Sequence, residues 1–254
     1  MKTLLLSCLL LSTSAMATTK KVPYELDKTK FEGVLVYEEG GKPKPGLVLV
    51  PNWLGVTDAN VKQAELIAAR GYTVFVADMY GIAGKPKSAD EAGKASGAVK
   101  GNRALMRARV KKALEVLLAQ KGIPLEAAKL GAIGFCFGGT GALELARSGA
   151  KVAGVVSFHG GLSSPTPDDA KNITAKVLAL HGADDPFVPA EEVAGFEAEM
   201  RAAKIDWQLV AYGNAVHSYS DVDANMPGKA QYNAQVATRA YAAMDAFFAE
   251  AFAK

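Results

Sequence analysis

The chain has 254 residues, of which 50% are hydrophobic and 22% are charged, and its formal net charge is +3. This length and composition suit one domain with a full hydrophobic core. The nearly balanced charge supplies no strong positive field, so neither a nucleic acid nor a membrane surface is indicated as a partner. Six basic residues between Lys100 and Lys112 have helical spacing, and we interpret them as a solvated helix face.

The first 17 residues have the layout of a secretory signal peptide. Lys2 supplies the positive start, Leu4 to Leu11 form an apolar core, and Ala15-Met16-Ala17 is a small-x-small cleavage site. The apolar run is much shorter than the ~20 residues needed to span a bilayer, so a membrane anchor is not expected. We predict cleavage after Ala17, a mature domain of residues 18–254, and export to the periplasm or the medium.

From residue 34 onward, short apolar strands alternate with longer helical stretches. The strands are predicted at 34–37, 47–50, 74–77, 130–135, 152–158, 177–180 and 207–211, and the helices at 58–70, 104–120, 139–147, 191–204 and 231–252. Gly81 to Lys100 is predicted to be a looser region. The alternation predicts a single α/β domain with a mainly parallel sheet covered by helices on both faces. In such sheets the functional site lies at the carboxyl ends of the strands.

One cysteine stands out. Cys8 lies in the signal peptide, so Cys136 is the only thiol of the mature chain and no disulfide can form within it. A lone thiol in an oxidising compartment is a liability unless it is buried or used. Cys136 is therefore the first candidate for chemistry.

Cys136 sits in the pentapeptide Gly134-Phe135-Cys136-Phe137-Gly138, which joins a predicted strand to a predicted helix. This is the G-x-nucleophile-x-G elbow, with cysteine in place of the usual serine. Such a turn strains the nucleophile and crowds its neighbours, and glycine at both flanks relieves the crowding. The helix that follows also favours negative charge at its N-terminus. The alternative is a buried structural cysteine in a glycine-rich turn.

A triad built on such an elbow runs nucleophile, acid, histidine along the chain. His159 and His181 precede the best acid candidates, which leaves His217. The acid is expected in the loop after the strand that ends at Leu180, where Asp184 and Asp185 are neighbours. One of the two can cap the turn or the following helix, and we favour Asp185 as the triad acid.

Two further observations limit the chemistry. His159-Gly160-Gly161 looks like an oxyanion motif, but it follows the strand after the nucleophile, and we interpret it as a tight turn at a pocket wall. The chain has no phosphate-cradling loop and no cluster with metal-ligand spacing. No cofactor and no metal are expected.

The motifs together resemble those of dienelactone hydrolases, along nearly the whole mature domain. The matching stretches are Trp53–Val56, Ala77–Tyr80, Gly134–Gly139, Asp185–Pro189 and Ala215–Tyr219. The resemblance implies an α/β-hydrolase fold, with Cys136, Asp185 and His217 as the triad. It also implies that the backbone N–H groups of Trp53 and Phe137 form the oxyanion hole.

The chain departs from that family at three places. Asn52 stands where the family's archetypal enzymes carry a glutamate that helps to switch the cysteine between thiol and thiolate. Ile82 and Asp221 stand where two arginines hold the substrate's carboxylate. The triad residues are present, so the triad chemistry is expected to be retained. The three differences argue against dienelactone itself as the substrate. Lys85 or Lys87 could replace the missing cations.

The predicted function is hydrolysis of a small carboxylic ester or lactone through a covalent thioester on Cys136. The competing interpretation is a non-catalytic ligand-binding or thiol-sensing domain that kept the scaffold. The ordered triad favours the enzyme, whereas Asn52 and the missing arginines keep the alternative open.

Overall fold

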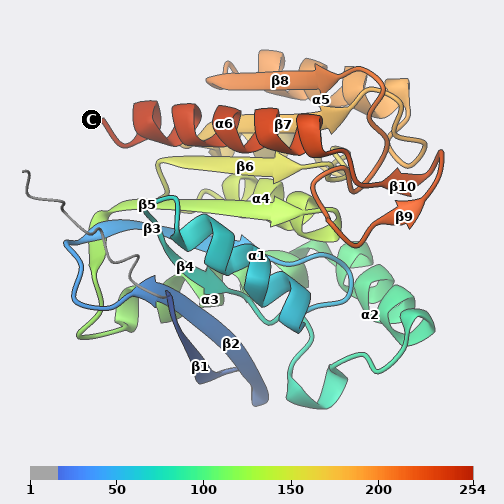
Figure 1. The fold of residues 1–254 in the computed structure, drawn as a ribbon. Coiled ribbons are helices and arrows are strands. Elements are labelled where there is room, and N and C mark those ends of the chain that lie inside the picture. Colours follow the sequence, from blue (N-terminus) through green and yellow to red (C-terminus); the bar gives the residue numbers. More distant parts are fainter. Residues whose placement is uncertain (1–16, 254) are drawn as a thin grey trace, which may run out of the picture.

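The computed structural model describes residues 17–253 as one layered α/β structure (Figure 1). The predicted signal peptide falls almost wholly on residues 1–16 and so lies outside the described residues, while Ala17 begins the first strand. The strands are β1 (Ala17–Leu26), β2 (Thr29–Glu38), β3 (Lys44–Val50), β4 (Thr73–Val76), β5 (Leu125–Phe135), β6 (Gly154–Phe158), β7 (Lys176–Gly182), β8 (Trp207–Tyr212), β9 (Asn225–Met226) and β10 (Ala230–Gln231). The helices are α1 (Asp58–Ala68), α2 (Ala89–Gly101), α3 (Arg103–Ala119), α4 (Phe137–Arg147), α5 (Ala190–Ala202) and α6 (Ala234–Ala251), with short 3-10 turns η1 (Ile82–Gly84) and η2 (Pro167–Asn172).

Eight strands form one sheet in the order β1-β2-β4-β3-β5-β6-β7-β8. The strands from β4 to β8 in this order pair in parallel, and β1 and β2 are antiparallel at one edge. The mainly parallel α/β-hydrolase sheet predicted from the sequence is confirmed. β9 and β10 form a separate small hairpin between β8 and α6.

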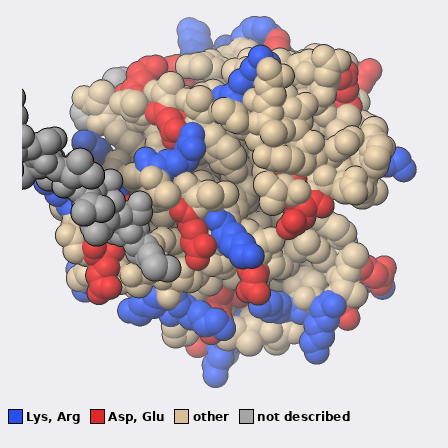
Figure 2. Space-filling model, viewed as in Figure 1, with Lys and Arg blue, Asp and Glu red and all other residues tan. Residues whose placement is uncertain are grey.

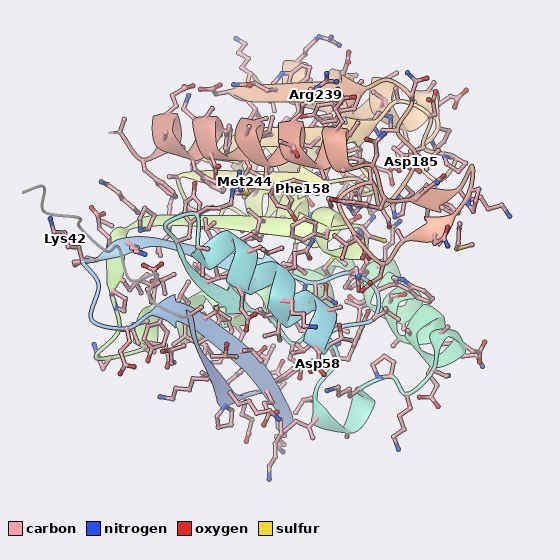
Figure 3. All side chains as sticks on the ribbon, viewed as in Figure 1. Lys42, Asp58, Phe158, Asp185, Arg239 and Met244 are labelled. Carbon is pink, nitrogen blue, oxygen red and sulfur yellow. The ribbon has the colours of Figure 1, made fainter. Side chains whose placement is uncertain are left out.

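The sheet has a hydrophobic core on each face because successive strand residues point to opposite sides. In β3, Leu47 and Leu49 pack with α1 and α6, while Val48 and Val50 pack with α3 and α4. Phe158 of β6 and Met244 of α6 belong to the first of these cores and lie between helix and sheet in Figure 3. Both faces are therefore covered, which leaves the strand ends as the accessible edge.

Among the elements that were not predicted are the edge strand β1, the helix α2 and the hairpin of β9 and β10. β1 pairs only with β2 at the edge of the sheet, and most of its side chains are at least partly exposed, so it lacks an apolar pattern. The looser region predicted at Gly81 to Lys100 instead contains α2, which Ser88 caps by accepting a hydrogen bond from the Glu91 backbone N–H at 3.2 Å. Only Ala92 and Val99 of α2 are buried, which is too few for a periodic signal.

The interpretation of the basic stretch as a solvated face is wrong for its arginines. The Arg107 guanidinium donates to Glu144 of α4 at 2.6 Å, and the Arg109 guanidinium donates to the Met79 backbone carbonyl. Glu144 also pairs with the fully buried Arg147, which reaches Glu199 of α5 at 2.7 Å. These acids lie on other helices, so the spacing of the arginines alone could not show that they pair.

The helices of the described residues do not meet the requirements of a membrane span. Within residues 17–253, none of the helices is both long enough and apolar enough to cross a bilayer. On the face that carries α1 and α6, basic and acidic side chains are interspersed (Figure 2).

Candidate active site

Cys136 lies at a sharp turn between β5 and α4. β5 ends at Phe135 and α4 begins at Phe137, so one residue makes the turn. Cys136 has φ 56° and ψ −118°, a left-handed conformation that is unusual for a residue with a side chain. Such strain costs about 1–3 kcal/mol and persists where the surrounding structure enforces it. The half-buried thiol is thereby presented at the carboxyl edge of the sheet.

Glycine is required on both sides of this turn by close backbone contacts. A Cβ on Gly134 would lie 1.9 Å from the Gly138 carbonyl oxygen, and one on Gly138 would lie 2.0 Å from the Val50 carbonyl oxygen. The start of α4 is therefore packed directly against β5 and the end of β3. The glycines predicted to relieve crowding at the elbow do so.

Strand register carries the neighbouring loops to the same edge. Phe135 pairs with Phe158, and Phe158 pairs with Leu180, so the residues after β5, β6 and β7 leave the sheet side by side. Asp185 follows β7 and His217 follows β8. Figure 3 shows Asp185 at the end of the molecule toward which the strands point.

Asp185 and His217 form a direct pair. The two groups meet at 2.8 Å between His217 Nδ1 and Asp185 Oδ2. The other carboxylate oxygen of Asp185 accepts the Phe187 backbone N–H at 2.8 Å, which fixes the carboxylate. Asp185 is buried and Asp184 is exposed, so Asp185 is the acid brought to the histidine. The backbone of His217 is in turn hydrogen-bonded to the backbones of Lys229 and Gln231, which flank Ala230 at β10.

The surroundings of His217 favour its positive charge. Burial opposes that charge, but the hydrogen bond to Asp185 and the neighbouring Cys136 side chain outweigh burial and raise the pKa of His217 to about 9. Cys136 therefore lies close enough to the imidazole to act on its charge. An imidazolium beside a sulfur stabilises negative charge on that sulfur.

The raised pKa of His217 should make the free energy of unfolding depend on pH. The folded value of about 9 lies above the ~6.5 of unfolded histidine, so the charge of His217 stabilises the fold fully below pH ~6.5 and less as the pH rises through ~9. A shift of this size corresponds to about 3 kcal/mol. We expect urea denaturation to show wild type losing roughly this amount, relative to His217→Gln, between about pH 6 and about pH 10.

The matching control follows the imidazole itself by NMR, because the pH dependence of stability sums over every group that titrates. The His217 resonances should move with an apparent pKa near 9 in wild type, and at lower pH in Asp185→Asn, which weakens the pair. A wild-type midpoint near ~6.5 would contradict the electrostatic account.

Of the predicted oxyanion donors, Phe137 directly follows Cys136, and Trp53 is linked to Phe137 through Tyr80. Phe137 is the first residue of α4, so its backbone N–H has no partner within the helix. Trp53 follows β3, and its carbonyl accepts the Tyr80 hydroxyl at 2.7 Å, while the Tyr80 ring packs on Phe137 with centroids 5.9 Å apart. Tyr80 thus ties the two predicted donor segments together.

Comparison with known proteins identifies the family. The profile of the dienelactone hydrolase family matches residues 31–252. The chain belongs to this family. A crystal structure of P91, a dienelactone hydrolase-like promiscuous phosphotriesterase from metagenomic libraries, superposes with a TM-score of 0.86 at 38% identity, covering 92% of this chain and 98% of that one.

Curated relatives agree at lower coverage. A Yersinia pestis protein named as a candidate carboxymethylenebutenolidase is 30% identical over 100 residues, which is 36% of this chain and 38% of that protein. The Aquifex pyrophilus protein usf is 26% identical over 208 residues, which is 78% of this chain and 85% of that protein. Membership of the dienelactone hydrolase family makes the chain a hydrolase of carboxylic esters or lactones.

Two positions where this family member departs from the archetypal enzymes lie in one cavity. Asn52 and Asp221 both line a cavity of about 260 Å³ between α1, α6 and the loop after His217. The Asn52 side-chain oxygen accepts from the Leu54 backbone N–H and from the buried Asn60 amide, each at 3.1 Å. An amide at position 52 is therefore bound to the loop and to α1. The third position, Ile82, lies at the surface, where it is exposed.

His159 lies on the wall of the same cavity and does not belong to an oxyanion motif. Its Nε2 meets the Ser220 hydroxyl at 2.8 Å, and its ring lies edge-on to His217 with centroids 5.1 Å apart. Burial and the charge of His217 hold the pKa of His159 well below its usual range, so it stays neutral. The Phe187 ring also packs edge-on against His217, with ring centroids 5.2 Å apart. The rings of His159 and Phe187 therefore both contact the imidazole. The sequence showed His159 as a pocket wall but not its contact with His217.

The cavity and the predicted triad are adjacent but distinct. Ser218 lines the cavity and follows His217 directly, yet neither Cys136 nor His217 is among the lining residues. The residues that can react lie at Cys136, Asp185 and His217 and not in the cavity. In the part of the chain that the structure describes, no group of three or more metal-binding side chains could hold an ion.

Proposed function

We propose that the chain cleaves a small carboxylic ester or lactone by nucleophilic attack of Cys136, with His217 and Asp185 completing the triad. The supporting observation is the strained Cys136 turn beside the 2.8 Å pair of His217 and Asp185. The three side chains stand in the chain order expected for this elbow.

The reaction has two steps. His217 takes the proton of Cys136, and the thiolate sulfur attacks the substrate carbonyl carbon to form a C–S bond. The C–O bond to the leaving group then breaks as that oxygen takes the proton from His217. A water molecule then gives a proton to His217 and attacks the thioester, which releases the acid and the Cys136 thiolate. Asp185 orients the imidazole and stabilises its cation. The N–H groups of Trp53 and Phe137 would stabilise the oxyanion in both steps, by roughly 3 kcal/mol per donor.

A panel of aryl esters and lactones tests this mechanism. We expect turnover of at least one neutral ester, and rapid quenching followed by intact mass analysis should show an acyl adduct on Cys136. An aryl phosphotriester belongs in the panel because the metagenomic relative carries that activity in its name. Absence of both turnover and adduct would favour the non-catalytic ligand-binding or thiol-sensing interpretation.

Substrate charge provides a second prediction. Ile82 and Asp221 supply no cation for a substrate carboxylate, and Lys85 and Lys87 lie at the exposed surface. A buried carboxylate that loses its cationic partners costs a few kcal/mol. We expect kcat/KM for a methyl ester of a carboxylated lactone to exceed that for the free acid by roughly tenfold or more.

The matched variant for this comparison is Asp221→Asn, which removes the negative charge but keeps the side-chain size. This variant should reduce the difference in kcat/KM between the methyl ester and the free acid. A wild-type preference for the free acid would show that other cations, such as Lys85 or Lys87, hold the carboxylate.

We also propose that the protein is exported and that its signal peptide is removed after Ala17. The Lys2, leucine-run and Ala15-Met16-Ala17 series supports this. Intact mass analysis of the protein recovered from the periplasm or the medium should give an N-terminus at Thr18. Recovery of protein that retains Met1 would contradict the proposal.

A further inference from the structure

Exposed apolar side chains are concentrated at the edge of the sheet that carries the triad. Among the described residues, eight large hydrophobic side chains are exposed, and six of them lie in the segments that follow β3, β4, β7 and β8. These six are Leu54, Ile82, Phe187, Val222, Met226 and Tyr232. We call them the apolar collar. Large apolar side chains that are exposed at the edge carrying a reactive site are candidates for substrate contacts.

Contacts connect the collar to the predicted oxyanion side of the site. Leu54 directly follows Trp53, and its backbone N–H is fixed by Asn52. Ile82 lies two residues after Tyr80, whose hydroxyl binds the Trp53 carbonyl. Leu54 therefore adjoins the place where a substrate carbonyl would sit, and Ile82 is close to it along the chain.

Other contacts connect the collar to the histidine side. Phe187 is 56% exposed although its ring packs against His217. Met226 pairs with Ala230, and Ala230 bridges to His217. Val222 and Tyr232 extend the collar to the cavity between α1 and α6. Apolar surface thus lies on both sides of the predicted triad.

We infer that the collar binds apolar groups that flank the scissile bond, so that the preferred substrate is a neutral ester with a hydrocarbon acyl chain of several carbons. This inference rests on the proposed function and extends it to a substrate class. Side chains that are exposed by 37–66% can cover a chain on one side only. Full burial of a CH₂ group favours binding roughly fourfold, and half burial about twofold.

The first experiment compares 4-nitrophenyl acetate with 4-nitrophenyl hexanoate, which share a leaving group and differ by four CH₂ groups. We expect kcat/KM to rise on the order of tenfold from acetate to hexanoate. The double variant Ile82→Asn/Met226→Gln should lower that ratio to roughly threefold. Because Ile82 and Met226 belong to the proposed binding surface, the readout is the ratio of hexanoate to acetate kcat/KM and not the acetate activity alone.

The matched control is Leu118→Asn, since Leu118 is a 40% exposed leucine on α3 rather than at the strand ends. This variant should keep the wild-type ratio. A wild-type ratio near one with measurable acetate turnover overturns the inference, and so does an equal loss in Leu118→Asn. A drop in the ratio that comes with a change from dimer to monomer by light scattering would instead make the collar an interface between copies, which also overturns it.

A binding measurement separates failure of the collar from failure of the proposed function. Hexanophenone and acetophenone present the same two chain lengths and cannot be hydrolysed. One outcome is that no ester is turned over, while calorimetry gives roughly tenfold tighter binding of hexanophenone than of acetophenone and the double variant loses this difference. That outcome would support the collar and contradict the proposed mechanism. Equal affinities for the two ketones would overturn the collar.

Discussion

Replacement of Cys136 by alanine is expected to lower kcat/KM for a neutral aryl ester by a factor of roughly 10,000 or more. The sulfur is the atom proposed to form the covalent bond, and what would remain is stabilisation by the oxyanion donors and by binding. The free energy of unfolding should change by less than about 1 kcal/mol, because the side chain is half-buried and alanine accepts the φ of 56° no worse than cysteine does. Steady-state kinetics and urea denaturation measure the two quantities.

Cys136→Ser is the control that keeps a nucleophilic atom at the same position. It should retain more activity than alanine and lose the thioester adduct in mass analysis. Undiminished hydrolysis in Cys136→Ala would contradict the proposed nucleophile and leave Cys136 as a structural or sensing thiol.

The parts of the site that the sequence predicted depend on local motifs or on the order of residues along the chain. Cys136 and its flanking glycines are adjacent in the chain, and the strand before and the helix after are readable from apolar runs. His217 followed from chain order alone. The sequence and the family resemblance favour Asp185 over Asp184, and the burial of Asp185 and its 2.8 Å contact with His217 distinguish the two neighbouring carboxylates.

What the sequence did not predict depends on contacts between distant segments. The arginines of α3 look solvated until Glu144, 37 residues beyond Arg107, is brought against them. His159 likewise meets Ser220 across 61 residues, and its packing on His217 follows from strand register rather than from any motif. The edge strand β1 and the exposed helix α2 bury too few apolar residues to carry a periodic pattern.

Gly138→Ala is expected to destabilise the fold by more than about 3 kcal/mol and to abolish most of the activity. The added Cβ would lie 2.0 Å from the Val50 carbonyl oxygen and 2.5 Å from that of Pro51, and both are backbone atoms of β3 and its exit. They cannot turn aside as a flexible side chain could, so α4 must move away from the sheet. Because Cys136 and the Phe137 N–H lie at the start of α4, that movement displaces the proposed nucleophile and an oxyanion donor together.

Gly97→Ala serves as the matched control, because Gly97 is also a helical glycine but a Cβ there meets no atom within 4 Å. Alanine at position 97 should stabilise the protein by up to about 1 kcal/mol through helix propensity, with activity unchanged. Thermal unfolding and ester turnover of the two variants therefore isolate the close contact from the general effect of glycine to alanine. If Gly138→Ala matched Gly97→Ala in both measurements, the helix start would not be locked against β3, and the elbow would owe its geometry to Cys136 alone.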